Sequence, residues 1–378
     1  MSSQYPKLRT DLVISEITQG GETSYVVKDP LTRRFFRLKE HEAFIARALD
    51  GATSPGEVRA AFETQFGAAL AESSLEHFIQ RIETLCLTDR GLAAEEIARL
   101  QRSVSTEAGF ASKLLGLRLR AIDPERLLRA LAPYTRFCFT RGFLIAGAVL
   151  TLAAIGITAA RWDIYVAQAR HLFRPGMITT FVLVVLVVTV LHEFAHALTC
   201  KHYGGEVHEM GFLLIYLVPA FYCNVSDAWL FSDKAKRLWV SAAGTVFQVV
   251  LYALAAVAWA FLARGTWWSD ACAITIAVAG LTALFNFNPL IKLDGYYLLS
   301  DYLAIPNLRK RAFAYLGSEA RRVIGRRVLG RPAAQRRDLT PRDRRIYLVY
   351  GITAGAYSLG LVIFVVAKIV AFIVSVVR

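Results

Sequence analysis

The chain has 378 residues, of which 55% are hydrophobic and 20% are charged, and its mean hydropathy is +0.41. Soluble globular proteins are about 45–50% apolar, so the composition excludes a single water-soluble domain, and the charge excludes a chain wholly in lipid. Five cysteines without a Cys-x-x-Cys pair indicate neither a disulfide framework nor a zinc ribbon. The numbers predict an apolar part within a membrane and a charged part outside it.

The net charge of +14 is confined to one part of the chain. Residues 1–90 hold 11 basic and 13 acidic side chains, which leaves 33 basic and 17 acidic side chains for residues 91–378. The basic excess therefore accompanies the apolar part. No apolar run precedes Gly142, so we expect no secretory signal peptide and a cytoplasmic N-terminus.

Residues 1–91 are predicted to form three strands and then three helices, a winged-helix-like α+β domain. Turn residues at Gly20-Gly21 and Asp29-Pro30 separate the strands. Ser54 is expected to cap the second helix, and the third is expected to be capped near Ser73 and Ser74. The expected strands are 13–17, 24–27 and 34–38, and the expected helices are 40–49, 55–66 and 73–85.

This order of elements resembles PqqD-like domains over residues 10–91. The resemblance implies a module that recognises the leader of a ribosomally made precursor peptide and binds it as an added strand. The net charge of −2 argues against a phosphate-binding surface, so we expect no nucleic acid as partner. A purely structural or regulatory cap is the alternative. The matching residues are Asp29-Pro30, Arg37-Leu38, Leu49-Asp50-Gly51-Ala52-Thr53 and Asp89-Arg90-Gly91.

Residues 92–141 are predicted to be a linker. Within it, Asp123-Pro124 begins a helix with Leu127, Leu128 and Leu131 on one face. We expect this helix to lie on the inner membrane surface, with lipid as its partner.

Five stretches beyond the linker have about the 20 apolar residues that a bilayer span needs. A sixth run, 211–223, is too short to span and contains Pro219, so it reads as a re-entrant segment or as a hairpin at the membrane edge. The last stretch continues past Lys368, which leaves open whether it spans once or forms a hairpin. The five stretches are 142–160, 176–191, 238–263, 271–291 and 346–367.

The distribution of Lys and Arg predicts a cytoplasmic N-terminus in a bacterial inner membrane. The segments 113–141, 201–237 and 292–345 hold 25 basic residues, whereas the opposite loops 161–175 and 264–270 hold four. The second and fourth spans then both run inward, so their polar ends share one depth. The basic cluster from Arg309 to Arg345 is expected to form a solvated inner face near anionic lipid.

The second span ends in His192-Glu193-Phe194-Ala195-His196. Residues four apart on a helix lie about 40° apart around its axis, so His192 and His196 can bind one metal ion. Glu193 does not bind the metal in this pattern and can remove a proton from a metal-bound water molecule. Histidines that reach from a helix end into the headgroups are the alternative interpretation.

A catalytic zinc ion takes three protein ligands and keeps one position open. The fourth span ends near Asp294, a carboxylate after the helix break at Pro289, and we favour Asp294 as the third ligand. Ionisable groups at membrane depth are costly and usually functional. The other candidates considered are Cys200, His202 and His208.

These residues resemble the site-2 protease family of intramembrane zinc metalloproteases over residues 142–305. There, an H-E-x-x-H helix and an N-x-x-P-x-x-x-x-D-G helix supply two histidines and an aspartate to one zinc ion. The resemblance implies His192, His196 and Asp294 as ligands, Glu193 as catalytic base and Asn286 near the scissile peptide. The third core helix departs from the family pattern, and the role of its Gln248 is left open.

The stretch from Pro219 to Trp229 resembles a narrower branch, the peptide zinc metalloproteases. We expect an extended substrate to pair with an edge strand near this stretch, although simple packing beneath the spans is an equal alternative. Asn224, Asn286 and Asn288 are our candidates for substrate contact.

The leading hypothesis is a mainly α polytopic zinc metalloendopeptidase, with about five to six transmembrane helices and one catalytic Zn²⁺. It would cleave a precursor peptide near the cytoplasmic leaflet, with export-complex proteins as possible further partners. The alternatives are cleavage of a membrane-anchored signalling protein, and a non-catalytic export or immunity component. The predicted parts are a recognition domain (1–91), a linker (92–141), a peptidase core (142–305), a basic cytoplasmic loop (306–345) and a C-terminal transmembrane segment (346–378).

Overall fold

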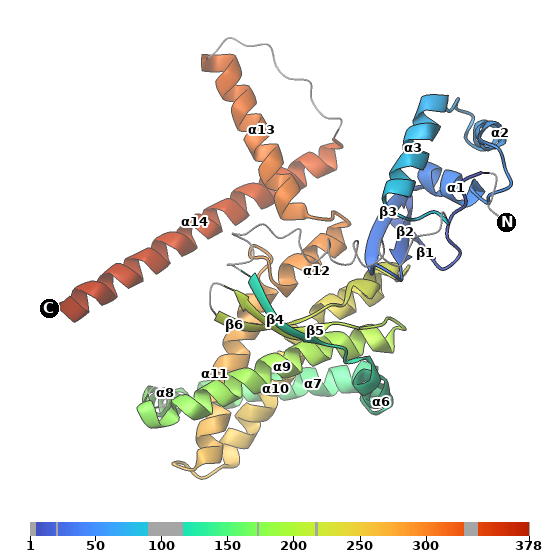
Figure 1. Cartoon of the computed structure of the whole chain (residues 1–378). Coiled ribbons are helices and arrows are strands. Elements are labelled where there is room, and N and C mark those ends of the chain that lie inside the picture. Colours follow the sequence, from blue (N-terminus) through green and yellow to red (C-terminus); the bar gives the residue numbers. More distant parts are fainter. Residues whose placement is uncertain are drawn as a thin grey trace. The chain divides into compact units, whose positions relative to one another are not determined.

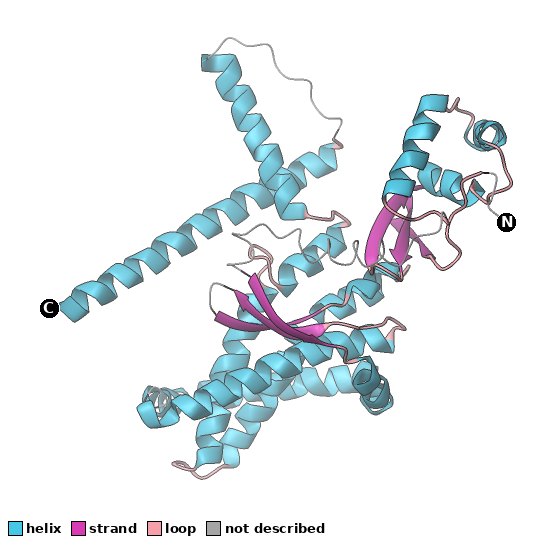
Figure 2. Cartoon of the chain, viewed as in Figure 1, coloured by secondary structure: helices cyan, strands magenta, loops and turns pink. Residues whose placement is uncertain are grey.

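The structure, a computed structural model, describes residues 5–19, 22–89, 116–171, 174–215, 218–328 and 339–377. The described part is mainly helical, with two small sheets (Figures 1 and 2). It forms two compact units, Met1–Arg136 with His196–Val240, and Phe137–Ala195 with Ser241–Arg378. The helices Ile178–His202 (α9) and Lys234–Phe261 (α10) contribute residues to both units. The expected fold class, a polytopic helical chain with strands and helices at its N-terminus, is confirmed.

The N-terminal part of the first unit has the three strands and three helices that the sequence predicts. Ser54 and Glu57 form a capping box at the start of the second helix, and Gly67 ends it with a φ of 63°. The cap predicted near Ser73 and Ser74 is wrong, because the carbonyl of Ala71 already accepts the N–H of Ser74. The elements are Val13–Gln19 (β1), Glu22–Asp29 (β2), Arg34–Lys39 (β3), Glu40–Ala48 (α1), Pro55–Phe66 (α2) and Glu72–Thr84 (α3).

The antiparallel sheet β1-β2-β3 uses its two faces differently. Val27 and Leu38 point toward α1, α2 and α3, and join the buried core of this domain. On the other face, Phe35 packs edge-on against Trp229, and the Ser15 hydroxyl donates to the Leu230 carbonyl at 2.5 Å. This face of the sheet therefore packs against the short 3-10 helix Ser226–Leu230 (η3).

The second sheet, in the same unit, decides between the two interpretations of the run 211–223. Met210–Ile215 (β5) and Val218–Cys223 (β6) pair antiparallel, so this run is a hairpin. A third strand, Gly116–Ile122 (β4), pairs with β5. The prediction for the linker, 92–141, included a helix and no strand, because this strand acquires its partner from a distant part of the sequence. Residues 92–115 and the motif residues Gly20, Gly21, Arg90 and Gly91 lie outside the described residues.

A chain of charged side chains ties the N-terminal domain to the loop after α9. Lys28 Nζ lies 2.7 Å from Asp227 Oδ2 and 3.5 Å from Glu206 Oε2, and the Lys28 and Asp227 side chains are about one tenth exposed. The backbone N–H of Glu206 also donates to Asp227. His208 continues the chain, with its ring nitrogens 3.1 Å from Asp123 and 3.3 Å from Glu206. Charge pairing thus connects β2, the 206–208 loop and Asp123.

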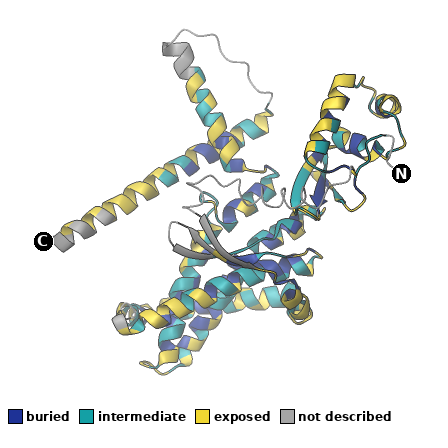
Figure 3. Ribbon diagram, viewed as in Figure 1, coloured by how far each residue is buried: buried dark blue, intermediate teal, exposed yellow. Residues whose placement is uncertain are grey.

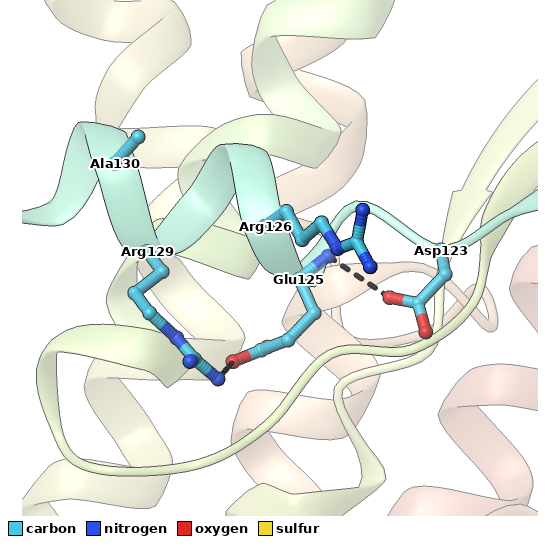
Figure 4. A pocket seen from close by; sticks show the side chains of 5 residues that line it. All are labelled: Asp123, Glu125, Arg126, Arg129 and Ala130. Carbon is cyan, nitrogen blue, oxygen red and sulfur yellow. Dashed lines mark hydrogen bonds and ion pairs between the residues drawn. The ribbon is translucent and has the colours of Figure 1, made fainter.

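Glu125 is the first residue of Glu125–Thr135 (α6), the helix predicted after Asp123-Pro124. Its buried carboxylate accepts hydrogen bonds from Lys201, at the end of α9, and from the Val207 N–H at 3.2 Å. Arg129 pairs with it along the helix, as Figure 4 shows. These bonds fix the C-terminal end of α9. The same turns of α6 border a cavity of about 770 Å³, lined by Asp123, Glu125, Arg126, Arg129 and Ala130.

Five helices in the described residues are long and apolar enough to cross a membrane. On three of them, Arg141–Ala160, Ile178–His202 and Pro341–Lys368, most apolar residues are exposed or half-buried in the chain alone (Figure 3), as expected for surfaces that lipid covers. The helix Trp162–His171 (α8) follows the first of them and is bonded to the third and the fourth, since Gln168 bonds both Trp259 and Asp270. The five are Arg141–Ala160 (α7), α9, α10, Trp267–Phe287 (α11) and Pro341–Lys368 within Pro341–Val377 (α14).

Three expectations change in the second unit. The span predicted over 271–291 ends as a helix at Phe287, because Asn288, which precedes a proline, takes an extended conformation. Much of the predicted basic loop is the helix Leu308–Val328 (α13), and residues 329–338 lie outside the described residues. The C-terminal segment is one helix, α14, whose 37 residues are about 55 Å long. A hairpin at Lys368 is therefore excluded.

Replacing Lys28 by Met should loosen the N-terminal domain. The change leaves the Asp227 carboxylate buried without its cation, which costs about 3 kcal/mol. We expect the thermal unfolding midpoint of the full chain in detergent to fall by roughly 5–10 °C. Lys7→Met is the matched control, because the Lys7–Asp89 pair is exposed and 3.9 Å long. An unchanged midpoint in the Lys28 variant would show that the Lys28–Asp227 pair does not stabilise the N-terminal domain.

The hydrogen bonds of the Glu125 carboxylate predict that the stability of the fold depends on pH. Burial alone would raise the pKa of this carboxyl, but the hydrogen bonds from Lys201 and Val207 hold its pKa below the usual value of 4.5. A lowered pKa stabilises the fold above pH 4.5, and this stabilisation is lost as the pH falls through the lowered pKa. Glu125→Gln should therefore flatten the decline of the unfolding midpoint below pH 4.5. A decline as steep in the variant as in the wild type would contradict this role of Glu125.

Candidate metal centre

The helix α9 carries three of the predicted site residues on adjoining turns. His192 and His196 are 6% and 7% exposed, and Glu193 between them is half-buried. The helix is continuous over its 25 residues, so the four-residue spacing alone brings the two imidazoles to one side of it. The sequence predicts this local arrangement because it depends on nothing beyond helical geometry.

Asp294 is the first residue of Asp294–Leu303 (α12), after the break that Pro289 imposes. A carboxylate in the first turn is favourable beside the helix N-terminus. Gly295 explains the second half of the Asp-Gly pair. A Cβ at this position would lie 2.5 Å from the carbonyl oxygen of Phe287, so only glycine lets α12 begin this close to the end of α11.

The structure brings His192, His196 and Asp294 together. The His192 Nε2 atom lies 3.1 Å from Asp294 Oδ2, and one possible ligand atom from each of the three residues lies within 4.8 Å of the others. Zinc ligands about 2.0–2.2 Å from the ion stand roughly 3.4 Å apart in a tetrahedron, so the spacing fits one ion.

The other candidates for a third ligand do not belong to this group. Cys200 is fully buried beside the backbone of Gly205, where a Cβ would lie 2.6 Å from its sulfur. His208 is engaged with Asp123 and Glu206 in the first unit. Of the candidates that the sequence offered, Asp294 is the one that lies with the two histidines.

Neighbouring groups orient two of the three side chains. His196 Nδ1 lies 2.7 Å from the carbonyl oxygen of Val240. A carbonyl oxygen can only accept a hydrogen bond, so Nδ1 must carry the proton. With Nδ1 protonated, Nε2 keeps the lone pair that a metal ion needs. The hydroxyl of Thr245, 1% exposed, donates to Asp294 Oδ2 at 3.1 Å.

Thr245 belongs to a polar stripe on the apolar helix α10 that the sequence analysis missed. Ser241, Thr245 and Gln248 follow one another at single-turn intervals and so share one face. The Ser241 hydroxyl donates to Asp301 Oδ2 at 3.1 Å, and Gln248 Oε1 accepts the amide of Asn286 at 3.1 Å. Polar residues three or four positions apart within an uncharged span are the sequence signal from which this stripe could have been predicted.

The three asparagines predicted to contact substrate have different places. Asn286 donates a hydrogen bond to Gln248, which is 3% exposed. This bond gives Gln248, whose role the sequence left open, a hydrogen-bond partner. Asn288 accepts the N–H of Leu290 at 2.9 Å and shapes the turn before α12. Asn224, in the first unit, bonds Glu209 and Ser226 where β6 ends. Their role toward a substrate stays a prediction.

Comparison with known proteins gives one relative. The chain is 26% identical over 117 residues to a Bacillus subtilis (strain 168) protein named "Putative peptide zinc metalloprotease protein YydH". The match covers 31% of this chain and 44% of the relative, so the chain spans less than half of that protein's length. No family model matches, and no solved structure matches. That protein's name is consistent with the two-histidine, one-carboxylate donor set.

Removal of the Thr245 hydroxyl tests the orienting role of this residue. Thr245→Val keeps the volume and loses the donor to Asp294, so we expect zinc affinity to fall about tenfold, the lower end for such partners. Competition with a chromophoric chelator on the purified chain measures it.

Thr275→Val is the matched control, because the Thr275 hydroxyl donates to the Ala271 carbonyl of its own helix. Equal affinities in the two variants would refute the orienting role.

Proposed function

We propose that this chain is a membrane-embedded zinc metallopeptidase that hydrolyses a peptide bond near the cytoplasmic leaflet. One observation carries the proposal: His192, His196 and Asp294 offer ligand atoms within 4.8 Å of one another, and Glu193 stands beside them on α9. Two imidazoles and one carboxylate form a ligand set of catalytic zinc sites, and the glutamate after the first histidine of such a helix serves as the general base. The name of the relative supports the same chemistry.

The chemistry needs a Lewis acid and a base. A bound zinc ion supplies Lewis acidity, which polarises a peptide carbonyl and acidifies water. The carboxylate of Glu193 takes a proton from water as oxygen attacks the carbonyl carbon, and then delivers it to the nitrogen of the leaving amine. The hydroxyl group of water ends on the new carboxyl, and the proton ends on the amine.

The surroundings of the site suit this reaction. Both histidines are buried, at 6% and 7% exposed, so bulk water has little access to their rings. Exclusion of water strengthens the interaction of Glu193 and the ligands with developing charge. The excess of basic residues in the segments that flank the inner ends of the spans supports a cytoplasmic depth for the site in a bacterial inner membrane.

A precursor peptide held by the N-terminal domain is the substrate that we propose. Among the described strands, β3 pairs with β2 alone, so its other edge can accept an extended peptide. One face of the sheet is occupied by η3 through Lys28, Ser15 and Phe35, and the other face packs on α1, α2 and α3, so an extended peptide would add at an edge of the sheet.

Replacing Glu193 by Gln tests the catalytic proposal. The variant keeps all three ligands, so we expect the zinc content of the purified chain to stay at one ion per chain. Cleavage should fall about a thousandfold, within the range for loss of a general base. The assay uses short peptides encoded beside the gene, with products identified by mass spectrometry.

Glu76→Gln, on the exposed surface of α3, is the matched control and should cleave as the wild type does. Full activity of the Glu193 variant would refute the peptidase. Cleavage of membrane-anchored proteins without any cleavage of the short peptides would refute the substrate class and keep the reaction.

A further inference from the structure

The six residues between α11 and α12 bear directly on Asp294, because α12 begins with it. This turn is held by two residues from the C-terminal helices. The Tyr350 hydroxyl, on α14, donates to the carbonyl oxygen of Pro289 at 3.1 Å. The Arg309 Nη1, on α13, donates to the carbonyl oxygen of Leu290 at 2.7 Å. Both acceptors lie within five residues of Asp294, where the helix break frees backbone carbonyls.

Arg309 is itself fixed. Its second terminal nitrogen donates to the Ser358 hydroxyl at 3.0 Å, and its guanidinium lies 5.2 Å from the centre of the Phe313 ring. Its backbone N–H donates to the hydroxyl of Tyr296, which is 2% exposed and lies two residues after Asp294. One residue therefore contacts the chain on both sides of Asp294.

The packing around these bonds is apolar and close. Tyr350 is 5% exposed, and at Gly351 a Cβ would lie 2.6 Å from the Leu316 side chain, so α13 and α14 approach closely there. A planar guanidinium with several donors holds a geometry that one flexible point charge does not. The buried cluster consists of Tyr296, Ile305, Leu308, Ala312, Tyr347, Tyr350 and Ala354, with Leu290 packed against it.

We propose that Arg309 and Tyr350 are positioning residues of the metal site, which hold the 288–293 turn so that Asp294 faces His192. The inference rests on the proposed function, since it takes Asp294 as a metal ligand. It separates Arg309 from the other basic residues of α13, such as the exposed Lys310 and Arg311. It also makes α13 and α14, which lie outside the predicted peptidase core, part of the site.

The test uses Arg309→Met and Tyr350→Phe in the full chain, purified in detergent. Zinc affinity is measured by chelator competition at 20 °C, and the chain loaded with Co²⁺ gives a visible absorption spectrum that reports the number and kind of ligands. We expect zinc affinity about tenfold lower in Arg309→Met and an altered Co²⁺ spectrum, because Asp294 is no longer held in place. Arg309→Lys should give an intermediate affinity.

Lys310→Met and Tyr357→Phe are matched controls on the same helices and should bind as the wild type does. Wild-type affinity and spectrum in both Arg309→Met and Tyr350→Phe, even with a lower unfolding midpoint, would overturn the inference. Losses as large in Lys310→Met would overturn it too. If Arg309→Met does not fold, Tyr350→Phe, which loses one hydroxyl, decides in the same way. Failure of the proposed function is distinct, because the wild type itself would then bind no stoichiometric zinc.

Discussion

The candidate site depends on one contact, the 3.1 Å approach of the Asp294 carboxylate to the His192 imidazole. The two residues come from helices far apart in the sequence, and neither helix could make the site alone. The contact requires that α11 stop at Phe287 and that α12 start beside it. Pro289 ends the first helix, and Gly295 lets the second begin within reach of the Phe287 carbonyl. Backbone geometry therefore comes before the chemistry of the side chains.

A polar cluster within apolar helices is stable only when its members are bonded, because an unbonded polar group costs several kcal/mol there. The face of α10 supplies those bonds at single-turn spacing, through Ser241 to Asp301, Thr245 to Asp294 and Gln248 to Asn286. On α9, His196 is bonded to the Val240 carbonyl, and Lys201 in the C-terminal turn is bonded to Glu125 outside the apolar segment. The helix that carries both histidines is thus held near its C-terminal end.

Features that depend on local sequence could be predicted. The two histidines share a face of α9 because of helical spacing, the spans follow from apolar length, and Ser54 and Gly67 delimit α2. Features that depend on a distant partner could not. The strand β4 needs β5 as its partner, although its alternating Leu and Arg residues carried a period-two signal. The helix end at Phe287 was obscured by the apolar residues that continue past Pro289. Arg309 looked like one more basic residue near lipid, and only the fold separates it from its neighbours.

The central claim is that two imidazoles and one carboxylate of this chain hold a single zinc ion. X-ray absorption at the zinc edge of the purified chain tests it most directly. The account predicts one zinc ion per chain, four-coordinate, with nitrogen and oxygen ligands at about 2.0–2.2 Å and two imidazole signatures. The Asp294→Ala variant should lose one oxygen ligand or the ion itself. A sulfur ligand at about 2.3 Å, or a zinc signal that is the same with and without Asp294, would contradict it.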